Sequence, residues 1–361
     1  MKYIKLLSAV AVFVASAAYA EENVVNIYNW SDYVAEDTIK NFEKSTGIKV
    51  VYDVFDSNEL LESKMLSGSS GYDVVVPSFQ FMARQIQAGV FLKIDKPLLT
   101  NYKNLDKNIM SILEGNDPGN AYGVPYMMFT TGIGYNIEKV KERISEDKIG
   151  SWDMIFDPET SSKLADCGIT LLDAPTEIMA AALNYLGKDP TTENVEDLKA
   201  AMELTLSIRK NIRYFHSSQY INDLANGDIC VSVGYSGDIF QARDRAAEAK
   251  QGVNVTYVIP KEGAQVGFDM MAIPDDAPHK ENAHKFINYI LEGKVAADIS
   301  NYVFYANPNT AANEFVAKEV LNNPGIYPPE DVKKKLFALQ PKSSRYDRTL
   351  TRAWTKIKTG Q

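Results

Sequence analysis

The sequence predicts an α/β protein that folds into two lobes, and three observations support this prediction. In the first hundred residues, strand-like segments such as Val24–Trp30 and Lys49–Phe55 alternate with helix-like segments, an order typical of a mainly parallel sheet wrapped by helices. A second alternating block runs from about residue 151 to residue 250. The chain has 361 residues, more than one hydrophobic core usually supports.

Each expected element follows from its own pattern. A helix with Ile39 and Phe42 on one face should end at Gly47, and the uncharged, glycine-containing segment 125–135 (PYMMFTTGIGY) predicts an extended strand that crosses between the lobes. The C-terminal part should be mostly helical, with proline-rich turns at 323–329. Further strands are expected at 72–77, 169–172, 230–235, 253–260 and 266–274, and further helices at 58–66, 79–88, 192–209 and 280–292.

Residues 1–20 have the features of a secretory signal peptide. Lys2 and Lys5 precede an apolar run, and Ala18-Tyr19-Ala20 forms a small-residue cleavage motif. The apolar run is too short to span a bilayer as a helix, and no cysteine directly follows the expected cleavage point. We therefore expect a soluble, exported mature chain without a lipid anchor.

The composition is that of an ordinary globular protein, with 45% hydrophobic and 24% charged residues. The formal charge is −9, and it becomes −11 when the two lysines of the expected leader are removed. An acidic surface disfavours nucleic acid and anionic membranes as partners and favours the approach of cations. The two cysteines, Cys167 and Cys230, are expected to form one disulfide in an oxidising compartment.

The usual motifs of enzymes are missing, so the sequence predicts no catalytic residue, metal or cofactor. None of the three histidines belongs to a zinc motif, and there is no P-loop. Asp238 stands where a nucleophile elbow needs its last glycine, and Ile137 stands where a dinucleotide-binding motif needs its third. A pair of catalytic carboxylates, as in glycosidases, stays open as an alternative.

Several strand ends, or the turns after them, carry an aromatic residue beside a carboxylate. In open α/β sheets, ligands bind beyond the carboxyl ends of the strands. Carboxylates would neutralise the ends of a buried polyamine, and flat rings would cover its methylene groups. No arginine lies in these segments to hold the carboxylate of an amino acid. The segments are Trp30-Ser31-Asp32-Tyr33, Tyr235-Ser236-Gly237-Asp238 and Phe268-Asp269, and Glu177 lies in a further turn.

Each of these residues also has a structural interpretation. Asp32 and Asp238 could be helix caps, and Glu177 could simply favour the first turn of its helix. The aromatic residues could belong to the core. From the residues alone, these alternatives stay open.

Ten further runs extend over nearly the whole chain. They are IYNWSDY (27–33), DVFDSNE (53–59), YDVVVPS (72–78), TTGIGYN (130–136), LDAP (172–175), NYLGKDP (184–190), YFHSSQYINDLANGDIC (214–230), FYANPN (304–309), NPGIYPP (323–329) and TRAWTKIK (351–358). In these runs the chain resembles the periplasmic spermidine/putrescine-binding proteins of bacterial ABC importers, the putrescine-binding members in particular.

The resemblance implies a type II-like periplasmic binding protein with a hinged cleft between its lobes. It implies a periplasmic monomer that captures a polyamine, most readily putrescine, by hinge closure and delivers it to an inner-membrane ABC permease. Lobe 1 would comprise residues 21–128 and about 249–301, and lobe 2 residues 129–248 and about 302–361. The disulfide between Cys167 and Cys230 matches a bonded pair in relatives. The implied ligand contacts are Trp30, Ser31, Asp32, Tyr33, Ser78, Glu177, Tyr235, Asp238, Asp269 and Tyr305, with Ser217 and Leu339 at the periphery. Phe268 is added from the residue pattern, although alternation along its strand points it to the face opposite to Asp269.

One position departs from the family pattern. Relatives have a bulky aromatic residue two positions before the final acid, and this chain has Gly267. The missing ring should leave space in the cleft, which would favour spermidine, agmatine or another extended cation. A polyamine sensor of the same fold, and an exported enzyme acting on a cationic or sugar substrate, are the other hypotheses.

Overall fold

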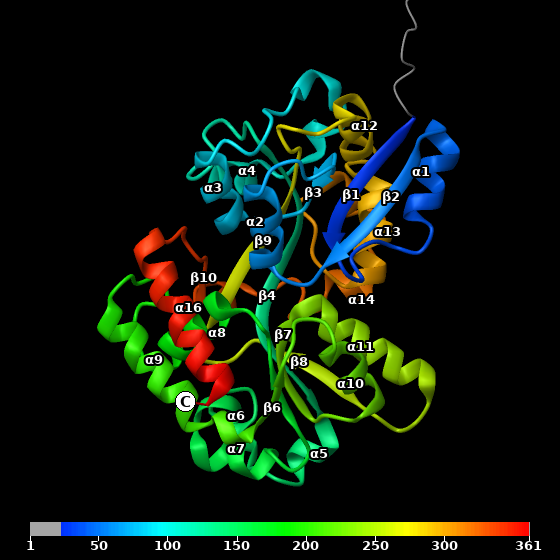
Figure 1. The fold of residues 1–361 in the computed structure, drawn as a ribbon. Coiled ribbons are helices and arrows are strands. Elements are labelled where there is room, and N and C mark those ends of the chain that lie inside the picture. Colours follow the sequence, from blue (N-terminus) through cyan, green and yellow to red (C-terminus); the bar gives the residue numbers. More distant parts are fainter. Residues whose placement is uncertain (1–22, 361) are drawn as a thin grey trace, which may run out of the picture.

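The computed structural model describes residues 23–360, so the signal peptide expected at residues 1–20 lies outside the described residues. One mixed sheet runs through the molecule in the strand order β2-β1-β3-β9-β4-β7-β5-β6, with β10 added beside β9 and β8 beside β4. Helices gather around its two ends and form two lobes (Figure 1). The predicted α/β class and two-lobed architecture are therefore present.

The first lobe is built around β1 (Val24–Trp30), which pairs in parallel with β2 (Lys49–Phe55) and β3 (Val74–Val75). The strands β1 and β2 have the predicted bounds, whereas the strand expected at 72–77 is paired only over two residues. The helices of this lobe are α1 (Thr38–Thr46), α2 (Asn58–Leu66), α3 (Phe79–Gln87), α4 (Lys107–Leu113), α12 (Lys280–Ile290) and α13 (Gly293–Val303) (Figure 1).

Two long antiparallel strands connect the lobes. They are β4 (Gly123–Asn136) and β9 (Ala264–Ala272), which pair along most of the length of β9 with an irregularity between Pro125 and Met127. Figure 1 shows both strands passing between the two groups of helices. The expected crossing strand is therefore present. Because the sheet continues through both lobes, the predicted lobe boundaries near residues 128, 249 and 301 stay a prediction.

The second lobe contains the other end of the sheet and a second group of helices. Its strands are β5 (Ile169–Leu171), β6 (Ile212–Phe215), β7 (Val231–Tyr235) and β8 (Val255–Val258). Its helices are α5 (Ile137–Lys141), α6 (Asp153–Phe156), α7 (Pro158–Leu164), α8 (Pro175–Tyr185), α9 (Val195–Ser207), α10 (Tyr220–Asn226), α11 (Ser236–Ala249) and α16 (Ser344–Thr359) (Figure 1). The short elements α14 (Lys318–Leu321), α15 (Glu330–Lys333) and β10 (Leu336–Phe337) lead from α13 to α16.

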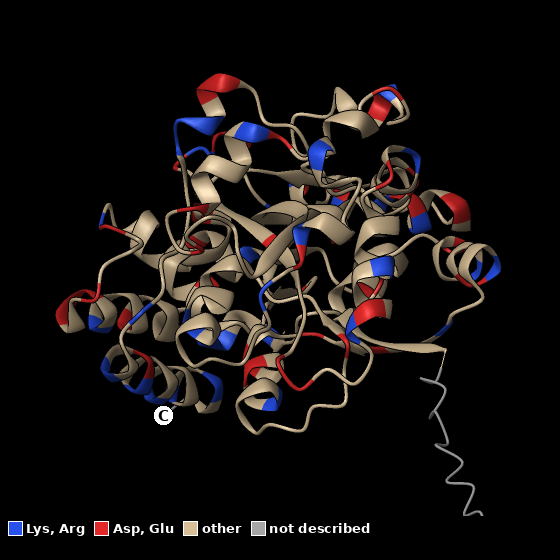
Figure 2. Ribbon diagram, turned by 90° about the horizontal axis from the view of Figure 1, so that it is seen from above, with Lys and Arg blue, Asp and Glu red and all other residues tan. Residues whose placement is uncertain are grey.

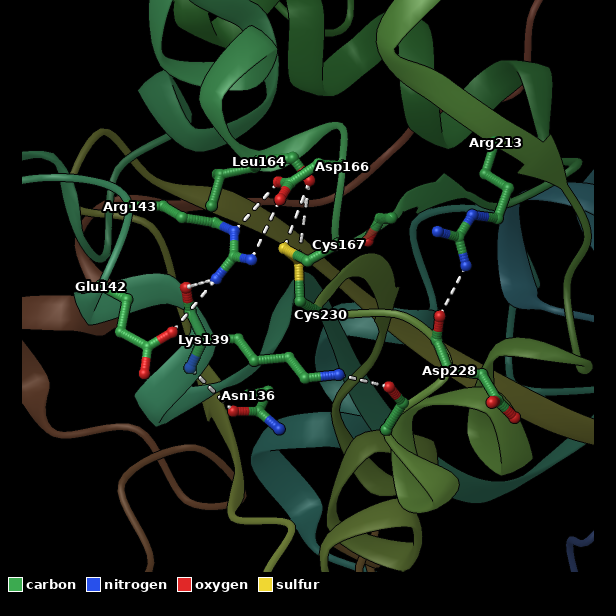
Figure 3. Close-up of a disulfide and its surroundings, with 12 residues drawn as sticks. Asn136, Lys139, Glu142, Arg143, Leu164, Asp166, Cys167, Arg213, Asp228 and Cys230 are labelled. Carbon is green, nitrogen blue, oxygen red and sulfur yellow. Dashed lines mark hydrogen bonds and ion pairs between the residues drawn. A yellow bond between two sulfur atoms is a disulfide. The ribbon is translucent and has the colours of Figure 1, made fainter.

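The expected disulfide joins Cys167 to Cys230, with their Cα atoms 5.4 Å apart (Figure 3). It ties the turn after α7 to the start of β7 and closes a loop with a sequence separation of 63. A loop of this size predicts about 4 kcal/mol of stabilisation through restriction of the unfolded chain. Beside it, Arg143 pairs with Asp166 at 2.9 Å.

Acidic and basic residues are interspersed along the described part of the ribbon, with no large region of a single charge (Figure 2). Within residues 23–360, no helix is both long and apolar enough to cross a membrane.

Candidate polyamine-binding site

A cavity lies where the two lobes meet, with about 380 Å³ of free space between its lining atoms, its open mouth included. Its lining comes from both lobes and from the crossing strands. The lining residues are Trp30, Ser31, Tyr33, Asp56, Ser78, Phe129, Ser217, Tyr235, Asp238, Asp269 and Tyr305.

Asp269, inside β9, forms the first acidic group of the cavity and is only 3% exposed. Its two carboxylate oxygens accept hydrogen bonds from the Tyr33 hydroxyl at 2.5 Å and the Ser78 hydroxyl at 2.6 Å. Asn58, at the start of α2, in turn donates to the Ser78 hydroxyl and accepts from the Ser78 amide. Two hydroxyl groups and an amide network thus hold the carboxylate in one orientation.

Asp238, in the first turn of α11, forms the second acidic group and is 7% exposed. It accepts hydrogen bonds from the Tyr220 hydroxyl at 2.6 Å and the Tyr305 hydroxyl at 2.7 Å. The N-cap residue of α11 is Tyr235, and Asp238 makes no cap hydrogen bond. The helix-cap alternative for Asp238 is therefore wrong, since hydroxyl groups hold its carboxylate at the cavity.

Aromatic rings form the walls between the two acids. The Tyr33 ring meets the Tyr305 ring edge-on at 4.9 Å, so the hydroxyl donors of the two carboxylates also pack against each other. Trp30 and Tyr235, which come from different lobes, have ring centroids 6.2 Å apart. The Trp30 indole donates to the Val76 carbonyl at 2.9 Å, which fixes the plane of its ring.

Burial makes both carboxylates harder to ionise. Burial, together with the nearby charge of Asp238, raises the pKa of Asp269 to about 7, although its two hydroxyl donors act in the opposite direction. Burial also raises the pKa of Asp238 to about 6, again against its two donors, and the charge of Asp32 raises it further. None of the described residues lining the cavity is a lysine or arginine. A cation placed here would therefore meet two oriented acids with no basic competitor.

Three of the expected contact residues lie outside this lining. Asp32 has a left-handed backbone (φ 54°) and an exposed side chain that pairs with Arg245 at 2.8 Å. Phe268 packs in the core of the first lobe, because alternation along β9 directs it away from the face of Asp269. Glu177 is buried in the first turn of α8, and its pKa is raised mainly by burial and then by the charge of Asp269. Leu339 is buried and also lies outside the lining.

The lining includes two residues that sequence reasoning missed, Asp56 and Phe129. Asp56 lies inside a family-like run, so its acidity and its place after a strand could have marked it. Phe129 lies in the middle of a crossing strand, where nothing in the local pattern separates a lining residue from a core residue.

Other contacts hold the lobes together around the cavity. Arg84 on α3 pairs with Asp347 on α16, and it also pairs with Glu62 on α2 at 2.8 Å. The Gln241 amide donates to the Asp32 carbonyl at 3.3 Å. The structure therefore has the lobes in contact on more than one side of the cavity.

Comparison with known proteins agrees with this architecture. Residues 37–328 match the family described as bacterial extracellular solute-binding protein. The chain is 56% identical over 344 residues to the putrescine-binding periplasmic protein PotF of Escherichia coli, covering 95% of this chain and 93% of PotF. It is 54% identical over 350 residues to the putrescine-binding periplasmic protein SpuD of Pseudomonas aeruginosa, covering 96% and 95% of the two chains.

A solved structure of a relative has the same fold. The spermidine/putrescine ABC transporter substrate-binding protein PotD of Streptococcus pneumoniae superimposes with a TM-score of 0.74 at 25% identity. The alignment covers 93% of this chain and 99% of that chain.

Proposed function

The chain belongs to the family of bacterial extracellular solute-binding proteins, and from this premise we propose that it binds a polyamine, putrescine first, in the cavity between its lobes. One observation carries the proposal: Asp238 and Asp269 are both buried at a single cavity, and none of the described residues lining it is a basic side chain. Burying two acids in this way is costly unless cations bind to them. The names of PotF and SpuD, which are described as putrescine-binding, point to the same ligand.

The proposed mechanism is closure of the lobes around the ligand. Asp269 is held by the first-lobe residues Tyr33 and Ser78, while Asp238 on α11 is held by Tyr220 of the second lobe. A dication that contacts both acids would be bound fully only when the lobes are together, and this difference in affinity would stabilise the closed state. Trp30 and Tyr235, whose rings meet edge-on at 6.2 Å, would together form an apolar wall for its methylene groups.

The closed complex would deliver the polyamine to an ABC permease in the inner membrane. The chain would work as a monomer in the periplasm after removal of the signal peptide expected at residues 1–20. Three features support this placement: the disulfide, which suits an oxidising compartment, the acidic composition, and the periplasmic relatives.

Isothermal titration calorimetry of the purified protein tests the proposal. Putrescine should bind at micromolar concentration or below, and spermidine and agmatine should be compared beside it. The matched control ligand is 1,4-butanediol, which has the same four-carbon chain without charge and should not bind. Failure of all three cations to bind at millimolar concentration, or equal binding of the diol, would overturn the proposal.

A further inference from the structure

Phe129 provides an aromatic ring of the cavity that the sequence analysis did not predict. It lies on β4, is 5% exposed and lines the cavity. Its ring meets the Tyr235 ring edge-on at 5.3 Å. In the antiparallel pairing of the crossing strands, its direct partner on β9 is Gly267.

The ring of Phe129 fills the space that a side chain at position 267 would need. A Cβ atom built on Gly267 would lie 2.3 Å from the Cζ atom and 2.7 Å from the Cε1 atom of Phe129, distances that real Cβ atoms do not reach. Direct cross-strand partners point to the same face of a sheet, and so do residues two apart along a strand. The ring therefore lies on the same face as Asp269, and the free space expected from Gly267 is not there.

We propose that Phe129 is a specificity-determining residue, whose ring forms the apolar wall beside Asp269 and limits the length of the bound polyamine. The inference rests on the proposed function. Gly267 is required for it, because any larger residue there would displace the ring. The aromatic wall reaches the cavity from β4 instead of β9, so the preference for a short diamine is kept although position 267 has no side chain.

The ring itself occupies the space that limits length. It is packed against Gly267 and the Tyr235 ring and lines the cavity. Removing it would enlarge the binding cavity by the volume of the ring and make room for a longer cation.

The test compares affinities for putrescine and spermidine by calorimetry. Phe129→Ala should weaken putrescine binding by about 10-fold through loss of buried apolar contact, and should weaken spermidine binding less. The dissociation constant for putrescine divided by that for spermidine should therefore rise at least about threefold. Phe91→Ala is the matched control, because Phe91 is buried in the first-lobe core and does not line the cavity. It should lower the melting temperature and leave the ratio unchanged.

A swap of the two residues sharpens the test. Gly267→Phe alone should lower the melting temperature, because two rings compete for one space. Phe129→Ala combined with Gly267→Phe should recover both stability and putrescine preference relative to either single change. If Phe129→Ala is folded and keeps the wild-type ratio, or if the double variant only adds the two single effects, this inference fails while the proposed function stands. If the wild type binds no polyamine, both fail.

Discussion

The two acids of the cavity have the same local construction in different parts of the fold. Asp269 lies on a sheet strand and accepts from Tyr33 and Ser78, whereas Asp238 lies at the start of a helix and accepts from Tyr220 and Tyr305. In each case two hydroxyl groups orient the carboxylate without supplying a positive charge. Two oriented carboxylates of this kind are complementary to a ligand that carries two positive charges.

The surroundings of the two acids differ in electrostatics. Asp238 has Arg245 close enough to lower its pKa, which burial brings to about 6. For Asp269, burial together with the charge of Asp238 raises the pKa to about 7, and no lysine or arginine of the described residues lines the cavity beside it. Of the two acids, Asp269 is therefore the one that changes protonation near neutral pH. Its ionised form depends more on the bound cation than that of Asp238 does.

The largest expected effect comes from neutralising either acid. Asp269→Asn and Asp238→Asn should each weaken putrescine binding by about 100-fold or more, because the ligand's ammonium group would be buried without its counter-charge. Asp269→Asn should have the larger effect, since no cation near it already offsets the charge. Calorimetry at pH 8 measures both, and melting temperatures check that the variants fold.

The control for these variants is Asp73→Asn. Asp73 is also fully buried, but its carboxylate accepts from the backbone amides of Asn26 and His279 and does not line the cavity. Its replacement should lower the melting temperature and leave putrescine affinity unchanged. Near-wild-type affinity in Asp269→Asn or Asp238→Asn would show that the acid concerned is structural.

The next effect is that of pH on binding. Lowering the pH from 8 to 6 should protonate Asp269 first and then Asp238, so that putrescine affinity falls by about 10- to 20-fold as protons compete with the cation. Calorimetry in two buffers of different ionisation enthalpy should show proton release on binding near pH 7. Affinity that is constant across this range would contradict the raised pKa of Asp269.

The raised pKa of Asp269 has the opposite effect on the stability of the free protein: lower pH weakens putrescine binding but stabilises the fold. Because the pKa of Asp269 is higher in the folded than in the unfolded chain, its contribution to stability is present below the unfolded pKa near 4 and is lost as the pH rises through about 7. Melting temperatures of the wild type without ligand, relative to Asp269→Asn, should therefore fall between pH 5 and pH 8.

Much of this site could be predicted from sequence, and the limits have physical causes. Asp238 follows the end of β7, as the local pattern of an acid beside an aromatic residue predicted, whereas Asp269 has the same pattern but lies inside β9 and not at its end. Tyr220 and Phe129 could not be found in this way, because their roles depend on partners that only the tertiary fold brings close. Asp32 has the right local pattern, but its left-handed backbone and its pairing with Arg245 place the carboxylate outside the lining.

Removing one hydroxyl donor from each acid should weaken putrescine binding less than neutralising the acid does, and by different factors for the two acids. Tyr33→Phe removes one donor to Asp269 and keeps the ring contact with Tyr305, so at pH 7 it should weaken putrescine binding by about 10-fold. Tyr305→Phe acts on Asp238, which is already mostly ionised at pH 7, and should have a smaller effect. Calorimetry at pH 7 and pH 9 tests this. Both effects should shrink at pH 9, and equal effects at both pH values would show that the hydroxyls act by direct contact instead.

The smallest change in putrescine affinity is expected from replacing Asp32, and of the two acids this replacement should affect only Asp238. Asp32→Asn breaks an exposed pair with Arg245, so the affinity for putrescine should change by less than about threefold. It should lower the pKa of Asp238, because the charge of Asp32 raises that pKa, and should leave the pH dependence that arises from Asp269 in place. Calorimetry between pH 5 and pH 8 can resolve this, since only the lower-pH part of the profile should move. A loss of affinity comparable to that of Asp238→Asn would show that Asp32 contacts the ligand itself, and that the lobes rearrange further when the polyamine binds.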